Sequence, residues 1–332
     1  MPGRPRPRSE GAAGCGQEAG TPFRGTQGTL SMKHFAMRLF DEASGPDHPI
    51  ARKLRELLDG KEHLAEDSGL GWIHHTRKCS FRNVNLSRSC LTLVLSGRKV
   101  LSGQEAKSSE TLPSGCLVLF PAGENVFCSN MPEKGEYLAL TLSFPKEMLS
   151  RVHQRVATAR PRREPPEVVM LEDALERFLD ALLVQRDALL AEMRQEQILY
   201  LLWKDGMDVF SVQDETIGRL RELVEADPCR RWTTEMLAEA LCMSGRTLRR
   251  HLERSGTTST ELVRLSRLHV GLSLLQSRRM RVGEVARACG YGSQSRFAER
   301  FRERFGLNPA DILATRTVSG AKLTGTGATR QP

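Results

Sequence analysis

The carboxyl-terminal third of this chain contains an imperfect internal repeat. Each copy has the pattern of a short helix, a turn and a second helix, so the region is restricted to a compact helical domain with two similar halves. The second copy has a slightly longer turn, because the offset between matching positions grows along the repeat. Ala238, Leu248 and Gly256 correspond to Ala286, Phe297 and Gly306, at offsets of 48, 49 and 50 residues.

Net positive charge is concentrated in the same region. The stretch from Cys229 to Arg316 contains 17 arginines, no lysine and 8 acidic residues, which gives +9, the formal charge of the whole 332-residue chain. Arginine suits phosphates and guanine edges because its planar guanidinium donates two parallel hydrogen bonds. A solvated basic surface would also give a positive charge, but exclusive use of arginine in a helical domain favours nucleic-acid binding.

The first copy predicts a second helix with an apolar back and a basic front. Arg246, Arg249 and Arg250 follow the i, i+3, i+4 spacing of one helix face. Leu248 and Leu252 lie on the opposite face, where they can pack into a core. A helix of this kind fits the major groove of DNA.

The second copy predicts a similar helix with a larger core. Phe297, Phe301 and Phe305 repeat every four residues, which is typical of a buried stripe and not of a platform for stacking bases. The residues left on the outside or on the flanks are Gln294, Ser295, Arg296, Glu299 and Arg302.

Turn and cap residues stand at matching places in both copies. Ser244 and Ser293 are the expected N-caps of the second helices, and Gly290 stands at a turn that needs a positive φ. Between the copies, the apolar periodicity of 262–275 predicts one long helix that holds the two units rigidly. The two second helices could then enter successive major grooves, roughly 34 Å apart.

Residues 213–316 resemble the DNA-binding domain of the AraC/XylS family of transcriptional regulators. The pattern AxxxGYxxxSxFxxxFxxxFGxxP is present from Ala286 to Pro309. The resemblance implies a bacterial, cytoplasmic regulator, an activator more than a repressor, with double-stranded DNA and RNA polymerase as partners. It implies base-reading roles for Arg246, Arg249 and Arg250 in the first unit and for Gln294, Ser295, Arg296 and Glu299 in the second. We also expect DNA phosphate contacts from Thr233, Arg254, Arg300 and Arg302.

The chain departs from the family pattern at four packing positions. Ile312 stands where an aromatic residue is usual, Asn308 replaces Ser or Thr, and Leu262 replaces Tyr or Trp. Gly271 replaces a usual alanine in the linking helix, a loss of about 1 kcal/mol of helix propensity. These positions bear on the packing of the two units and not on their contacts with DNA.

The amino-terminal half has a different period. Short apolar runs at 70–75, 90–95, 116–120 and 137–144 are separated by Gly- and Pro-containing turns, which predicts an antiparallel sandwich or barrel. Helical patterns are expected over 34–66 and Leu171–Leu202. The stretch Ser89–Val152 resembles the cupin-like regulatory domains found in part of the AraC/XylS family, which bind small effectors or partner proteins or mediate dimerisation.

The predicted fold class is therefore α+β. It combines a cupin-like antiparallel β domain with flanking helices and an all-α domain with two helix-turn-helix units joined by a long helix. The predicted segments are a disordered arm at 1–31, a regulatory domain at 32–165, a helical linker or dimerisation segment at 166–210, a DNA-binding domain at 211–316 and a disordered tail at 317–332.

Motifs for catalysis, metal binding and membrane insertion are missing from the sequence. The adjacent His74 and His75 would point to opposite faces of a strand, unlike the His-x-His pair of a metal-binding cupin. We therefore expect no metal and no cofactor, with one histidine semi-buried and the other exposed. There is no GxSxG or GxxxxGK motif, which argues against an enzyme. No apolar run approaches the roughly 18–20 residues of a membrane helix, and eight scattered cysteines without a CxxC pair are typical of a reducing compartment.

Three hypotheses for the amino-terminal domain follow. In the first, it senses a small-molecule effector and controls DNA binding. In the second, it is a protein-interaction module set by a chaperone or anti-activator, and the acidic and apolar residues from Glu172 to Gln197 would suit such a partner or a homodimer. In the third, a cupin enzyme carries an accessory DNA-binding domain, which requires a metal.

Overall fold

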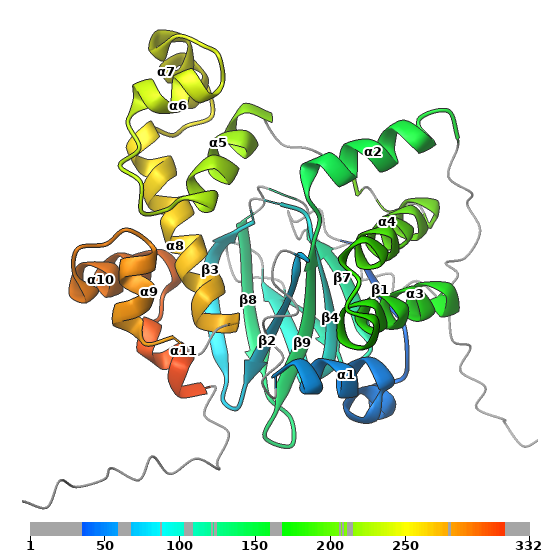
Figure 1. Cartoon of the computed structure of the whole chain (residues 1–332). Helices are drawn as coiled ribbons and strands as arrows, with labels where there is room; N and C mark the ends of the chain where they lie inside the picture. Colours follow the sequence, from blue (N-terminus) through cyan, green and yellow to red (C-terminus); the bar gives the residue numbers. More distant parts are fainter. Residues whose placement is uncertain are drawn as a thin grey trace, which may run out of the picture.

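Two antiparallel sheets form the amino-terminal domain (Figure 1). The computed structural model describes residues 35–58, 68–86, 88–102, 109–120, 122, 125–159, 168–205, 207, 209–210, 215–277 and 280–315. The segments predicted to be disordered, 1–31 and 317–332, lie outside these residues, and the predicted domain limits stay predictions.

In the described ranges, nine strands make up the two sheets. One sheet has the order β1-β7-β4-β9-β2 and the other the order β3-β8-β5-β6, with antiparallel pairing throughout. The predicted sandwich is confirmed, whereas the sheets do not close into the alternative barrel. The strands are β1 Phe35–Arg38, β2 Leu70–His75, β3 Cys79–Asn85, β4 Cys90–Ser96, β5 Arg98–Ser102, β6 Ser109–Pro113, β7 Cys116–Phe120, β8 Asn125–Met131 and β9 Tyr137–Ser143.

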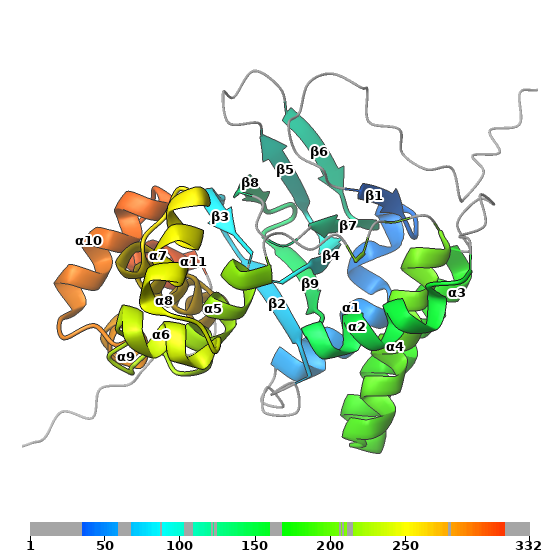
Figure 2. The ribbon, with the colours of Figure 1, turned by 90° about the horizontal axis from the view of Figure 1, so that it is seen from above.

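Helices cover the outer face of the five-stranded sheet (Figure 2). On β4, Leu91 and Leu93 pack with the helices, whereas Val94 packs on the other face beside Tyr137 of β9. Burial on both faces explains why this strand is apolar apart from Thr92 and Ser96. The covering elements are η1 Glu42–Asp47, α1 Pro49–Leu58, α2 Lys146–Val156, α3 Val168–Asp180, the π-helical η3 Ala181–Gln185 and α4 Ala188–Lys204.

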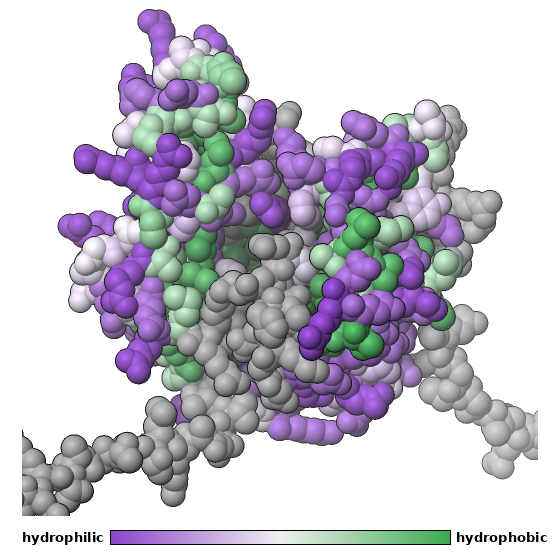
Figure 3. Space-filling view, viewed as in Figure 1, coloured by the Kyte–Doolittle hydropathy of each residue, from purple (hydrophilic) through white to green (hydrophobic). Residues whose placement is uncertain are grey.

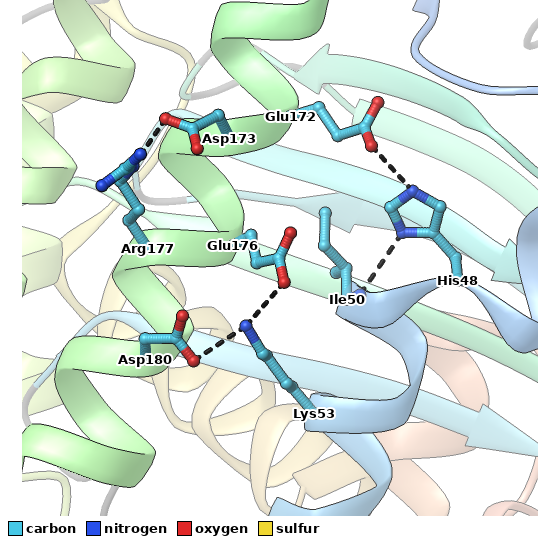
Figure 4. A network of polar contacts seen from close by, with 8 residues as sticks. All are labelled: His48, Ile50, Lys53, Glu172, Asp173, Glu176, Arg177 and Asp180. Carbon is cyan, nitrogen blue, oxygen red and sulfur yellow. Dashed lines mark hydrogen bonds and ion pairs between the residues drawn. The ribbon is translucent and has the colours of Figure 1, made fainter.

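Ion pairs fix α1 against α3 (Figure 4). Lys53 Nζ lies 2.7 Å from Glu176 Oε1 and 2.8 Å from Asp180 Oδ1, and His48 Nε2 lies 3.0 Å from Glu172 Oε1. Further along, the acidic residues of α4 pair with Arg151 and Arg155 of α2. Much of the acidic character between Glu172 and Gln197 is thus used inside the domain.

Two expectations for the amino-terminal half were wrong, and four strands were missed. Residues Phe35–Arg38 form β1 and not the start of a helix, because they pair with β7 and complete the sheet edge. Strands β3, β5, β6 and β8 escaped prediction because their polar residues break the apolar pattern. Neither histidine is exposed: His75 is fully buried, and His74 is half-buried with Nε2 3.4 Å from Glu136 Oε1.

The carboxyl-terminal domain is all-helical, and α8 is the predicted long helix. The first unit (α6 and α7) lies near the amino end of α8, and the second unit (α9 and α10) lies near its carboxyl end (Figure 1). The helices are α5 Glu215–Ala226, α6 Thr234–Ala240, α7 Gly245–Arg254, α8 Ser259–Ser277, α9 Val282–Ala288, α10 Gln294–Phe305 and α11 Pro309–Thr315.

The second unit is packed against the sandwich. Its phenylalanines belong to the same buried cluster as Phe81 and Val126 of the four-stranded sheet. Polar contacts close the boundary: the Thr76 amide donates to the Thr315 carbonyl (2.6 Å), and Arg304 Nη2 donates to Asn125 Oδ1 (3.2 Å). The two domains therefore share one hydrophobic core at the second unit.

Candidate nucleic-acid interface

The first unit presents its three arginines as the sequence predicts. Leu248 and Leu252 are buried, and Arg246, Arg249 and Arg250 are exposed on the opposite side of α7. Side-chain caps fix both helices: Thr233 Oγ1 accepts from the Met236 amide (3.2 Å), and Ser244 Oγ accepts from the Thr247 amide (3.1 Å). Each cap satisfies a helix N–H that would otherwise lack a partner.

One of these arginines forms an ion pair in the protein without DNA. Arg249 Nη2 lies 3.1 Å from Glu235 Oε1, and both side chains are mostly exposed. An exposed pair of this kind contributes little to stability, so it can be exchanged for a contact with DNA. Arg246 and Arg250 have no ion-pair partner among the residues that the structure describes.

The second unit is built on the aromatic stripe. Phe297, Phe301 and Phe305 are completely buried, with neighbouring ring centroids 5.4 and 4.6 Å apart. The predicted cap is confirmed, since Ser293 Oγ accepts from the Arg296 amide at 3.2 Å. The four predicted base-reading residues of this unit, which are all exposed in the first two turns of α10, are Gln294, Ser295, Arg296 and Glu299.

The turn inside the second unit requires glycine. Gly290 has φ +73°, and a Cβ there would lie 2.6 Å from the Pro228 carbonyl oxygen. The first unit makes its equivalent turn with Cys242 at φ +54°, where there is room for a side chain. The two copies therefore form the same left-handed turn with different residues.

The predicted phosphate contacts differ in availability. Arg254 and Arg302 are exposed at the ends of their helices, whereas Arg300 Nη1 lies 2.8 Å from Glu303 Oε2. The hydroxyl of Thr233 already caps α6. Reading and phosphate roles stay predictions for all eleven residues.

A cavity of about 370 Å³ lies between the two units, on one face of α8, and we call it the saddle. Five arginines line it, together with Trp232 and Tyr291, and none of its described lining residues is acidic. Sequence reasoning assigned no role to three of these arginines, because their convergence depends on the packing of α8 between the units. The five are Arg231, Arg264, Arg267, Arg296 and Arg300.

A second cavity, of about 660 Å³, opens between the two sheets and is closed by α5 and α8. We call it the interdomain cavity. Lys99 of β5 lies inside with 4% of its surface exposed, and its Nζ donates to Asn130 Oδ1 at 3.0 Å. Within the described part of the chain, no carboxylate pairs with this ammonium. A buried ammonium without a counter-charge is costly, which is typical of a binding site.

Other buried donors in the interdomain cavity lack acceptors. Trp72 Nε1 and Asn130 Nδ2 are both buried without a hydrogen-bond partner in the described residues. Burial lowers the pKa of Lys99, while attraction to Cys128, Tyr137 and Cys90 in their ionised forms raises it above its usual value. Burial raises the pKa of Tyr137, and that of Cys90 to about 11, so these two neighbours are uncharged at neutral pH. Around Lys99 the cavity thus combines a cation and two N–H donors, whereas the two carboxylates in its lining, Glu222 and Glu225, belong to α5.

The inward position of Lys99 follows from the alternation of its own strand. In β5 the buried side chains are Lys99 and Leu101, two residues apart. Period-2 alternation therefore places the ammonium on the same inward face as a core leucine. A charged residue on the core face of a strand indicates a functional position.

Neither a metal-binding cluster nor a membrane-spanning helix is present in the described ranges. No group of three or more His, Cys, Asp or Glu side chains in them is placed to hold a metal ion. No described helix is both long and apolar enough to pass through a lipid bilayer.

Comparison with known proteins shows that the carboxyl-terminal domain is similar to helix-turn-helix domains of transcriptional regulators. Residues 237–315 match the family model described as "Helix-turn-helix domain". The urease operon transcriptional activator of Escherichia coli is 26% identical over 132 residues, which are 38% of this chain and 45% of that protein. The ornithine utilization regulator of Pseudomonas aeruginosa is 26% identical over 215 residues, which are 62% of this chain and 61% of that protein. The matched stretches thus span about half to three fifths of these relatives.

Solved structures match over a longer stretch. ToxT from Vibrio cholerae with an unsaturated fatty acid bound has a TM-score of 0.54 at 14% identity, covering 74% of this chain and 94% of ToxT. ToxT bound to (E)-4-(8-methylnaphthalen-1-yl)but-3-enoic acid has a TM-score of 0.53, covering 75% of this chain and 98% of ToxT. At this identity the likeness shows a shared two-domain fold.

Proposed function

We propose that the protein is a sequence-specific DNA-binding transcription regulator of the AraC/XylS type, because residues 237–315 match a helix-turn-helix family model and the chain is similar to known transcriptional regulators. Its two recognition helices, α7 and α10, read successive major grooves of one duplex. The observation that carries the proposal is that both helices expose basic or polar residues at the family's reading positions while their apolar faces are buried. Names of relatives such as the urease operon activator support activation more than repression.

The division of labour follows from side-chain chemistry. Arg246, Arg249 and Arg250 suit guanine edges, and Gln294 suits adenine. Arg254, Arg300 and Arg302 lie farther along the helices and suit phosphates, which position the protein without reading sequence. The proposal includes RNA polymerase as the partner through which bound regulator changes transcription.

Titration of a promoter fragment at several salt concentrations tests the proposal. Arg250→Ala or Arg296→Ala should each weaken binding to the cognate site by roughly 1–3 kcal/mol and relax specificity there. The matched control is Arg219→Ala, an exposed arginine on α5 outside the interface. If both variants bind cognate and random DNA as the parent does, the assignment of reading residues is wrong.

We further propose that the interdomain cavity binds a small amphiphilic carboxylate as the controlling signal. The ammonium of Lys99 and the N–H groups of Trp72 and Asn130 would receive the carboxylate oxygens. A chain of apolar atoms would occupy the space beside Phe81, and the volume suits a ligand of this size. The carboxylic acids bound by ToxT, a protein of the same fold, support this class of ligand.

Paired ligands test the effector. A long-chain fatty acid should raise the melting temperature of the protein, and the alcohol of equal chain length should do so less, because only the acid compensates Lys99. Lys99→Met should fold at least as well as the parent, since it removes a buried charge, and should lose the preference for the acid. Equal responses of parent and Lys99→Met to the acid would exclude Lys99 as the anchor.

The protein-interaction hypothesis receives less support. The acidic residues that would have attracted a basic partner are paired with Lys53, Arg151 and Arg155. The apolar residues stay available, and Figure 3 shows an apolar patch over α3 and α4. A homodimer through this patch stays a prediction, tested by the molecular mass in solution. The exposed large apolar side chains of α3, η3 and α4 are Val169, Met170, Val184, Leu189, Met193 and Tyr200.

A further inference from the structure

We propose that the saddle is a phosphate-binding site for the stretch of DNA backbone that separates the two major grooves. The inference rests on the proposed DNA-binding function and adds a third contact region, between the two recognition helices. It assigns Arg231, Arg264 and Tyr291 to DNA binding, positions to which neither the repeat nor the family pattern gave a role.

The charge of the saddle is only partly compensated. Arg264 makes two hydrogen bonds to Glu261, at 2.6 and 2.8 Å, and Arg300 pairs with Glu303. Arg267 donates instead to the carbonyl oxygens of Pro228 (2.8 Å) and Arg230 (3.0 Å), so its charge is held in place without a carboxylate. In the described ranges, the guanidinium groups of Arg231 and Arg296 have no ion-pair partner.

Tyr291 gives an independent indication of a missing acceptor. Its hydroxyl is buried at the saddle and has no hydrogen-bond partner among described residues. Burial raises the pKa of Tyr291 to about 12, so the group is a protonated donor at neutral pH. An unpaired buried hydroxyl is unfavourable. A phosphate oxygen would provide the acceptor beside the five guanidinium groups.

The position of the saddle selects DNA over a free anion. Arg296, a predicted base-reading residue, and Arg300 lie one turn apart on α10 and both face the saddle. The opposite wall comes from Arg264 and Arg267 on α8, the helix that joins the two units. When α7 and α10 occupy successive major grooves, the DNA backbone that separates the grooves passes between the two units. The saddle lies on that path.

The test compares three variants of the full chain by titration with cognate and random duplexes over a range of salt concentrations. Arg231→Gln and Tyr291→Phe are the test variants, and Arg219→Gln on α5 is the control. Arg231→Gln should weaken binding to both duplexes by a similar factor, roughly 5- to 10-fold near 100 mM salt, and reduce the salt slope by about one. Tyr291→Phe should weaken binding to both without lowering thermal stability, which a purely structural hydroxyl would not do.

The outcomes separate this inference from the proposed function. If the parent protein binds no DNA, the proposed function fails. If the parent binds but both test variants match Arg219→Gln in affinity and salt slope, only the saddle assignment fails. Loss confined to the cognate duplex would also overturn it, because phosphate contacts do not depend on sequence. Stabilisation of the parent by pyrophosphate, with unchanged DNA binding by the variants, would identify a free-anion site instead.

Discussion

The two helix-turn-helix units have the same arrangement of helices but differ in the hydrophobic core that stabilises each of them. The first unit has its own core, in which Leu237, Leu248 and Leu252 pack with α5 and the start of α8. The second unit has no separate core, because Phe297 and its neighbours are continuous with the interior of the sandwich. The orientation of the first unit is therefore set locally, and that of the second unit depends on the amino-terminal domain.

This difference gives the interdomain cavity a direct route to one unit. Leu272 of α8 lines the cavity and also belongs to the shared core. A ligand that changes the packing there would act on the second unit first, and on the first unit only through α8. Control of DNA binding would then be control of the spacing between α7 and α10.

The comparison of the two units predicts that two large-to-small substitutions differ in how far their destabilising effect extends through the molecule. Phe297→Ala should cost about 3–5 kcal/mol, and Leu248→Ala about 2–5 kcal/mol, because both side chains are completely buried. Only Phe297→Ala should also raise hydrogen exchange in the strands around Phe81, since that core is shared. Unchanged exchange in the sandwich of Phe297→Ala would contradict the shared core.

Gly271 marks where the second unit presses on α8. A Cβ at this position would lie 2.8 Å from two ring atoms of Phe297, so the glycine accommodates the aromatic stripe. We expect Gly271→Ala to destabilise the protein by roughly 1–3 kcal/mol through overpacking, although alanine is the better helix former. The control, Gly218→Ala on α5, meets no atom within 4 Å and should stabilise by about 0.5–1 kcal/mol. Urea unfolding measures the change in the free energy of unfolding for both variants. If both variants are stabilised, the ring of Phe297 can move aside at little cost.

Gly271 also shows what a sequence can and cannot give. The repeat, the caps at Ser244 and Ser293 and the long helix were predictable, because each depends on residues close in the chain. The meaning of Gly271 was not, because its partner Phe297 is 26 residues away and reaches it only in the folded domain. By the family pattern, Gly271 only lowers the helix propensity of α8. In the structure, the absence of a Cβ at this position makes room for the ring of Phe297.

The interdomain cavity and the saddle were harder to predict for the same reason. Lys99 and Asn130 come from neighbouring strands β5 and β8, and their pairing is fixed by sheet register. Strand β8 alternates polar and apolar residues too weakly to be recognised, so its partner was unknown. In the saddle, Arg231, which precedes α6, and Arg296 of α10 line the same cavity although they are far apart in the sequence. Sites of this kind need the topology before the chemistry can be assigned.

Acid should loosen the second unit before the first. Burial first, and then the charges of Arg304 and Arg221, lower the pKa of His269 to about 3, and its ring centroid lies 5.5 Å from that of Phe305. The unfolded chain, with a histidine pKa near 6.5, binds a proton at a pH where the folded protein does not. Stability is thus complete above about pH 6.5 and is lost as the pH falls toward 3, by about 2 kcal/mol at pH 5.

His269→Gln should remove this dependence between pH 7 and pH 5. Chemical unfolding at both values measures the effect, and hydrogen exchange should place the loss near α10 and not near α7. A parent and variant with the same change in stability would show that His269 does not titrate in this way.

The smallest effect concerns the surface pairs that each unit forms. Glu235 holds Arg249 in the first unit, and Glu303 holds Arg300 in the second. Both pairs are exposed, so Glu235→Gln and Glu303→Gln should each change stability by at most about 0.5 kcal/mol. Their effects on DNA should differ, because Arg249 is a proposed reader and Arg300 a proposed phosphate contact. Glu235→Gln should strengthen binding mainly to the cognate duplex, and Glu303→Gln should strengthen binding to any duplex; the reverse pattern in a titration would exchange the two roles.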